Sequence, residues 1–326
     1  MKQRLLWIDA FRGGLILIVI LGHALQHGDY NHNVAWNIIY SFHMAAFFAV
    51  SGYVNYWSTI SGKTLLRRTE QLLIPFFTWT IFVAIRSGDF QTTLLSEVLH
   101  PKMYWFIFSL FFIVVIFFTL QWVANKLRCR SIICMLGEWL FFIGLMLFVD
   151  VRCFGFQYVA YYFFFYGLGY YVNHYKWQPK LWFTIMIGGG WFVLALFWRM
   201  QEVSPILSSI SFVPSSFLIF AYRFVTAVFG SLFLLFVSSK VFVDNDSKTN
   251  NFLAYLGRES LGIYIIHIFI ATYWSTYLAR LLGSDTAILF VILDFFVKLC
   301  ISIVSVELIK RIPYVRFFLL GIKHKK

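Results

Sequence analysis

The stretch from Arg12 to Gly28 reads RGGLILIVILGHALQHG. Leu15 to Leu21 is an unbroken apolar run of the kind that a lipid bilayer favours, but Arg12 precedes this run and His23 follows it. An ionisable side chain inside a membrane span is costly, and its presence indicates a functional position. This segment therefore predicts a first transmembrane helix with a chemical role.

The composition extends this prediction to the whole chain. Of the 326 residues, 60% are hydrophobic and only 13% are charged, which excludes an ordinary soluble protein. We expect an all-α integral membrane protein of about ten transmembrane helices, with residues 1–326 forming a single transmembrane domain and no separate soluble domain. The expected spans are residues 8–26, 37–57, 72–86, 104–124, 132–149, 154–173, 181–198, 212–237, 260–279 and 286–308.

The distribution of charge predicts the orientation of these spans. The formal net charge is +13, and 19 of the 27 Lys and Arg residues fall in the ends and loops on the N-terminal side of the membrane, against five on the opposite side. Cytoplasmic loops concentrate positive charge, so we expect both termini in the cytoplasm, a multi-pass location in the inner (plasma) membrane, and no nucleic-acid partner. Asp9 and Arg12 interrupt the N-terminal apolar run, which favours a retained span over a signal peptide. The four cysteines show no spacing typical of a disulfide framework or a zinc site.

The polar residues of the first span lie on one helical face. Arg12 and His23 are 11 residues apart, which is nearly three whole turns and about 16 Å along the axis. Asp9 lies on nearly the same face, and Gly13 and Gly14 would let a ligand or another helix come close. We interpret this stripe as the lining of a path through the membrane.

Two other spans carry polar residues at similar positions. His43 lies about two turns into the second span, at a depth like that of His23, and Ser51 lies deeper. In the ninth span Ser260, Tyr264 and His267 fall on one helical face, which must contact protein or a cavity.

A basic cluster follows the second span and consists of Lys63, Arg67 and Arg68. Such a cluster can bind anionic lipid headgroups or hold a phosphorylated cofactor, and the sequence leaves both open. Asp294 and Lys298, four residues apart, are expected to neutralise each other as a structural pair.

Five segments of the chain together resemble the acyltransferase 3 family of integral membrane acyltransferases. They are IDAFRGGLILIVILGH, FHMAAFFAVSGY, LLRRTEQLLIPFFTW, MYWFIFSLF and LGRESLGIYIIH, in the family's order. Ala45 departs from the family's pattern, which usually has proline there.

The resemblance implies transfer of an acyl group, expected to be acetyl, from acyl-CoA to a hydroxyl of a cell-surface or lipid-linked glycan. It implies acetyl-CoA as the donor, a glycan or glycolipid acceptor, contact with the lipid bilayer, and no metal. The catalytic candidates are His23, Asp9 and His43, and the cofactor-binding candidates are Arg12, Lys63, Arg67 and Arg68. The residues expected to line the cavity or contact substrate are Ser51, Tyr104, Trp105, Ser260, Tyr264 and His267.

The chemistry of these side chains fits that expectation. Transfer from a thioester to a hydroxyl needs a base near the hydroxyl, and a histidine suits this task. His23 could act as general base or carry the acyl group transiently, and the sequence does not decide between them.

Two alternatives remain open at this stage. A proton-coupled transporter or a flippase of a lipid-linked sugar or small anion would also carry buried His, Arg and Asp, although no inverted repeat is evident in the sequence. A structural or sensory membrane protein could use the same groups only to fix helix packing. The acceptor sugar and the oligomeric state are not specified by the sequence.

Overall fold

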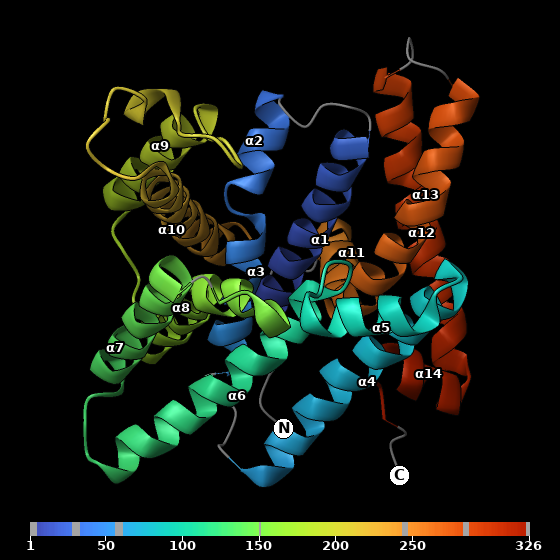
Figure 1. The fold of residues 1–326 in the computed structure, drawn as a ribbon, viewed down its shortest axis with the longest axis horizontal. Helices are drawn as coiled ribbons and strands as arrows, with labels where there is room; N and C mark the ends of the chain where they lie inside the picture. The colour runs from blue at the N-terminus through green and yellow to red at the C-terminus, as the bar shows by residue number, and fades with distance from the viewer. Residues whose placement is uncertain are drawn as a thin grey trace. The chain divides into compact units, whose positions relative to one another are not determined.

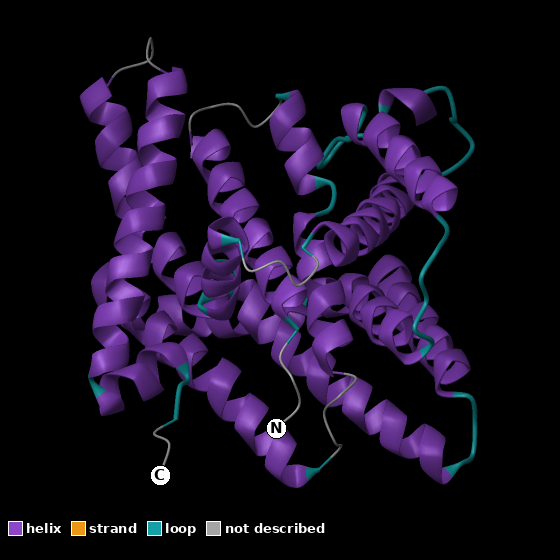
Figure 2. Ribbon diagram, turned by 180° about the vertical axis from the view of Figure 1, so that it is seen from behind, coloured by secondary structure: helices purple, strands orange, loops and turns teal. Residues whose placement is uncertain are grey.

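The structure is a computed structural model that describes residues 5–27, 33–55, 61–149, 151–242, 247–282 and 287–323. Throughout these ranges every regular element is a helix (Figures 1 and 2). The chain divides into two compact units, Met1–Val50 with Trp177–Ser305 and Ser51–Lys176 with Val306–Lys326. The chain passes from one unit to the other inside a helix at residues 50–51 and again at residues 305–306. Neither of these two boundaries is therefore a flexible linker. The prediction of a single transmembrane domain stays a prediction.

The first unit is built from helices at both ends of the sequence. Its helices are α1 (Leu6–His27), α2 (Val34–Tyr40), the start of α3 (His43–Asn55), α9 (Leu181–Leu196), α10 (Ser215–Val241), α11 (Lys248–Arg258), α12 (Ser260–Leu282) and most of α13 (Ala287–Arg311), with a short 3-10 turn at Pro205–Leu207. In this unit α1 packs against α11 most extensively, and also against α2, α10 and α12. The first helix is therefore its central element.

The second unit comes from the middle of the chain. Its helices are the end of α3, α4 (Gly62–Ser87), α5 (Phe90–Leu99), α6 (Trp105–Lys126), α7 (Ser131–Gly144) with a π-helical extension over Leu145–Val149, a 3-10 turn at Cys153–Gly155, α8 (Phe156–His174) and α14 (Pro313–Leu320). Within it α6 packs against α4, α7 and α8.

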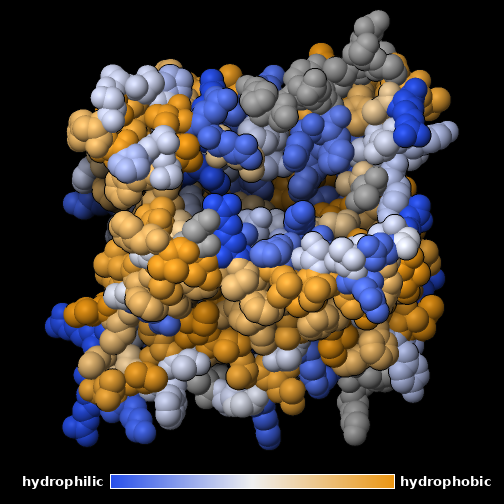
Figure 3. All heavy atoms as spheres, in the orientation of Figure 1, coloured by the Kyte–Doolittle hydropathy of each residue, from blue (hydrophilic) through white to orange (hydrophobic). Residues whose placement is uncertain are grey.

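The helices confirm an all-α membrane fold but not the count of ten spans. Each predicted span coincides with a helix or a helix pair, yet six helical segments of the described chain are long and apolar enough to cross a bilayer, or seven if α11 and α12, which bend by 70° at Glu259, form one span. Many apolar side chains on these helices face outward, as Ile133, Leu140 and Phe141 do on α7, with exposed fractions of 62–63%. Hydrophobic side chains also cover much of the face in Figure 3, as lipid contact requires.

The second predicted span is interrupted at Ser41 and Phe42. The Ser41 hydroxyl donates to the Ile38 carbonyl oxygen at 2.7 Å and accepts from the indole N–H of Trp191 at 3.1 Å. A serine that bonds to its own helix backbone competes with regular helix geometry, and here the tertiary contact with Trp191 favours the break. The break makes His43 the first residue of α3.

Two glycines set the distance between α1 and α11. A Cβ atom at Gly13 would lie 1.9 Å from the backbone oxygen of Leu253, and one at Gly257 would lie 1.7 Å from the backbone oxygen of Asp9. Backbones that approach this closely exclude any side chain at either position. Gly14 differs, because nothing lies within 4 Å of the Cβ position there.

We predict that Gly13→Ala lowers the free energy of unfolding by about 1–3 kcal/mol, the usual range for overpacking. The backbone of α11 cannot move away from the new methyl group without separating the two helices. Gly14→Ala is the matched control and should leave the melting temperature in detergent nearly unchanged. Equal melting temperatures for the two variants would contradict the close contact between α1 and α11.

Candidate functional site

The polar face of α1 contacts the start of α12. Asp9 is buried with 5% of its surface exposed, and Arg12 and His23 are half-buried. The Arg12 guanidinium donates from Nη2 to the hydroxyl of Ser260 at 2.9 Å. Two residues that are 248 positions apart, and that the sequence predicts to belong to one site, are therefore in direct contact.

The same two helices also meet at a second pair of residues. His267 on α12 is fully buried, and its ring centroid lies 5.4 Å from that of His23. Tyr264, also buried, lies 5.7 Å from His267 between ring centroids. The predicted face of the ninth span thus faces the predicted face of the first.

His43 is connected to His23 and His267 through the ring of Tyr40. The ring of Tyr40 lies 4.8 Å from that of His43 and 6.4 Å from that of His23, and its hydroxyl donates to Gln26 at 2.8 Å. The sequence predicts similar depths for His23 and His43, and the break between α2 and α3 allows Tyr40 to contact both. Tyr40 was not among the residues singled out from the sequence.

The ring nitrogens of two buried histidines are oriented by backbone carbonyl groups four residues earlier in the chain. Nδ1 of His43 lies 2.7 Å from the Ile39 carbonyl oxygen, and Nδ1 of His267 lies 3.1 Å from that of Ile263. A carbonyl oxygen only accepts, so in the neutral imidazole Nδ1 carries the hydrogen and Nε2 keeps its lone pair. Each ring therefore keeps a proton acceptor at Nε2.

A buried ion pair lies close to these imidazoles. Asp294 and Lys298 are both completely buried and paired with each other, and Ser275 donates a hydrogen bond to Asp294 at 2.8 Å. Lys298 is near enough to His23 and His267 to interact with both electrostatically. The sequence predicted the pair, but its position beside the histidines depends on long-range packing.

The remaining predicted residues belong to the second unit, where three basic side chains differ in their surroundings. Lys63 and Arg67 are exposed on the first turns of α4. Arg68 is half-buried and donates to Oδ1 of Asn55 at 2.7 Å, and Asn55 in turn donates to the hydroxyl of Tyr166. Burial lowers the pKa of the Arg68 guanidinium from its ordinary value, although arginine remains charged.

The last predicted positions of this unit are Ser51, Tyr104 and Trp105. Ser51 is half-buried beside Gly52, where a Cβ atom would lie 1.8 Å from the backbone oxygen of Tyr166. Tyr104 is buried with 1% exposed, and Trp105 stacks on Tyr158 at 4.4 Å between centroids. Asn55 and Tyr166 were missed from the sequence, and a polar asparagine at the end of an apolar span was the available signal for the first.

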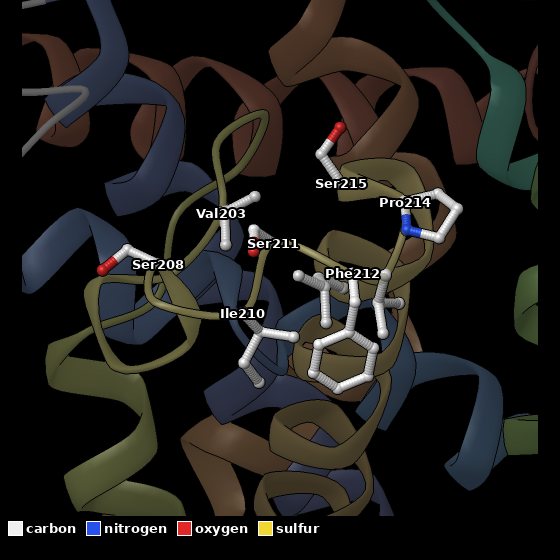
Figure 4. Close-up of a pocket in the computed structure, with 9 residues that line it drawn as sticks. Val203, Ser208, Ile210, Ser211, Phe212, Pro214 and Ser215 are labelled. Carbon is white, nitrogen blue, oxygen red and sulfur yellow. The ribbon is translucent and has the colours of Figure 1, made fainter.

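One open pocket of about 600 Å³ lies in the first unit, between α9 and α10 in the sequence (Figure 4). It is lined by Val203, Ser208, residues 210–215 and Leu218, and contains none of the predicted site residues. Tyr222 lies one turn beyond Leu218 and packs with Trp36 and Trp198, against which Tyr40 also packs. This aromatic cluster contacts Tyr40, the residue that also packs against His23 and His43.

Within the described ranges, no three His, Cys, Asp or Glu side chains gather in a way that could hold a metal ion. The groups that meet around α1 and α12 are imidazoles, hydroxyls, a guanidinium and a buried ion pair.

Helices long enough to cross a bilayer, together with histidine, arginine and serine side chains that meet between α1 and α12, define a membrane protein with polar groups gathered inside it. Comparison with known sequences identifies its class. A family model described as an acyltransferase domain matches residues 5–307, so the chain belongs to the acyltransferase 3 family.

Two curated relatives support this membership. Nodulation protein NolL of Mesorhizobium japonicum is 33% identical over 134 residues, a match that covers 34% of this chain and 34% of that protein. Nodulation protein NolL of Sinorhizobium fredii is 35% identical over 97 residues, covering 25% of each. The chain thus spans about a third or less of the length of these relatives. No solved structure matches it significantly.

The Asp294–Lys298 pair allows a test of the buried charges. We predict that Lys298→Met destabilises the protein by about 3–5 kcal/mol, because Asp294 would remain buried without a counter-charge. In the double variant with Asp294→Asn no charge is left, and Asn can still accept from Ser275, so most of the stability should return. Thermal unfolding in detergent measures both, and additive losses in the double variant would show that the two side chains are not coupled.

Proposed function

We propose that this protein transfers an acyl group, expected to be acetyl, from acyl-CoA to a hydroxyl of a cell-surface or lipid-linked glycan in the inner (plasma) membrane. Family membership supports acyl transfer. The observation that carries the proposal is the meeting of α1 and α12, where Arg12 bonds to Ser260 and the ring of His23 lies 5.4 Å from that of His267.

The proposed reaction uses these side chains in defined roles. His23 takes the proton of the acceptor hydroxyl while the hydroxyl oxygen attacks the thioester carbonyl, and the C–S bond then breaks as the ester C–O bond forms. The proton passes from His23 to the leaving sulfur, which releases CoA as a thiol. A transient acyl group on His23 would serve the same net reaction in two steps. Asp9 and His43 are the other two catalytic candidates.

The proposed donor contacts come from cations. Lys63 and Arg67 are exposed and free to meet a soluble anionic cofactor, whereas Arg68 already bonds to Asn55. We assign the CoA phosphates to Lys63 and Arg67 first, with Arg68 as a further contact, while Arg12 stays a candidate from the sequence. The glycan or glycolipid acceptor would be recognised separately.

A transporter or flippase is the alternative class. It would need the same buried histidines and ion pair for proton coupling. Transport would not consume acetyl-CoA, so release of free CoA by the purified protein, stimulated by an acceptor, separates the two classes.

We predict that His23→Ala lowers acyl transfer at least a hundredfold, since a positioned general base contributes on the order of 10²–10⁴. His27→Ala is the matched control, because His27 lies one turn further along α1, is exposed, and bonds only to the His23 carbonyl oxygen among the bonds seen here, at 2.7 Å. The assay is release of CoA thiol in detergent. Retention of more than about a tenth of the activity in His23→Ala would remove His23 from both proposed roles.

We predict that the double variant Lys63→Ala with Arg67→Ala raises KM for acetyl-CoA about tenfold or more, with kcat little changed, because charge-assisted contacts to phosphate are lost. The effect should shrink in high salt, which screens exposed charges. Lys126→Ala with Arg130→Ala, an exposed basic pair on the same predicted side, is the control.

An unchanged KM in the Lys63 and Arg67 variant would favour lipid anchoring as the role of the cluster. Arg68→Ala is tested separately. We expect it to lower thermal stability in addition to any effect on KM, because Asn55 would lose a buried partner.

The proposed orientation, with both termini in the cytoplasm, is testable with native cysteines. Cys129 and Cys153 are both exposed and lie on opposite predicted sides. In intact cells an impermeant thiol reagent should label a variant that retains only Cys153 and not one that retains only Cys129. The reverse pattern would invert the topology.

A further inference from the structure

His267 combines complete burial with an unused acceptor atom. Its Nδ1 bonds to the Ile263 carbonyl oxygen at 3.1 Å, and its Nε2 has no hydrogen-bond partner among the residues that the structure describes. Buried polar atoms are nearly always paired, so this exception calls for an explanation, and the neighbouring ring of His23 offers one.

The surroundings of Nε2 limit what this partner can be. Nδ1 and Nε2 lie on either side of the ring carbon Cε1, so a ring whose Nδ1 bonds to the Ile263 carbonyl oxygen still leaves Nε2 open to a neighbouring side chain. The ring of His23 lies 5.4 Å away between centroids, and nitrogens that face each other across this separation are near the hydrogen-bond range of about 3 Å. Tyr264, His27 and Lys298, the last of them paired with Asp294, are further titratable groups near His267. Of these neighbours, His23 belongs to the proposed reaction.

Resting on the proposed function, we propose that His267 is a positioning residue for His23. In the substrate-loaded protein Nε2 of His267 accepts a hydrogen bond from one ring N–H of His23. This bond fixes the tautomer of His23, so that its other nitrogen presents a lone pair to the acceptor hydroxyl. Catalytic hydrogen bonds are often long before substrate binds and shorten afterwards, which fits the unpaired state seen here.

The proton count follows from this assignment. His23 takes the hydroxyl proton and becomes an imidazolium with two N–H groups, one donating to His267 and the other returning its proton to the sulfur of CoA. His267 stays neutral throughout, because its own hydrogen is held by Ile263. The role of His267 is therefore to orient and stabilise a cation, which a neutral acceptor does without being consumed.

Three substitutions separate this role from simple packing. His267→Gln places an amide oxygen near the position of Nε2, His267→Asn places its polar atoms near that of Nδ1, and His267→Phe keeps the ring without either atom. We expect kcat to fall about ten- to a hundredfold in the Asn and Phe variants, the usual cost of losing a group that orients a ligand or base, with KM for acetyl-CoA within about twofold of wild type. The Gln variant should recover most of kcat.

Equal kcat for the Gln and Asn variants would overturn the proposal, as would a Phe variant that changes only KM. A second measurement does not depend on acyl transfer. With saturating CoA bound, so that the hydrogen bond is formed, and at about pH 8, where an ordinary imidazole is neutral, diethyl pyrocarbonate should modify His23 several-fold more slowly in the Asn and Phe variants than in wild type and Gln, because the hydrogen bond makes the free nitrogen more nucleophilic. Equal labelling rates overturn the positioning role. An absence of acyl transfer by the wild-type protein, with labelling rates that still differ, would instead overturn the proposed function.

Discussion

The contact between the backbones of α1 and α11 determines the rest of the first unit. Gly13 and Gly257 remove the side chains that would hold the two helices apart, and Leu253 and Asp9 fill the space with backbone atoms. Because α11 is joined to α12 through a bend of 70° at Glu259, the position of α11 also fixes where α12 begins. Ser260 therefore meets Arg12. Further along the same two helices, His267 meets His23. Polar groups that would be costly in lipid are satisfied between two helices instead.

The ion pair on α13 shows how the protein keeps charge beside a reactive centre. Asp294 and Lys298 neutralise each other, and the pair contributes a local field rather than a net charge. A buried pair is weak evidence for stability, since an apolar replacement of similar size often serves as well. Lys298 of this pair interacts electrostatically with His23 and His267, which packing alone does not explain.

The sequence predicted the helices and the faces of the site but not their long-range partners. Helical spacing was sufficient to place Asp9, Arg12 and His23 on one face and Ser260, Tyr264 and His267 on another, because both patterns are local. The bond from Arg68 to Asn55 and the contact of Asn55 with Tyr166 join α3, α4 and α8, and no local pattern encodes such a contact. The break at Ser41 was missed for the same reason, since Trp191 lies 150 residues away. The number of spans is also not settled by local apolarity, because α4 and α9 are helices of marginal length or polarity for a bilayer.

The bond between Arg12 and Ser260 also has a consequence for biosynthesis. Its two residues are 248 positions apart, and a ribosome that adds about 5–20 residues per second needs roughly ten to fifty seconds to cover that distance. The first helix leaves the ribosome early, carrying a guanidinium and an imidazole whose partners on α12 are not yet made. During this interval water or the insertion machinery must solvate those groups. The polar stripe of α1 therefore delays the full insertion of this helix into the lipid.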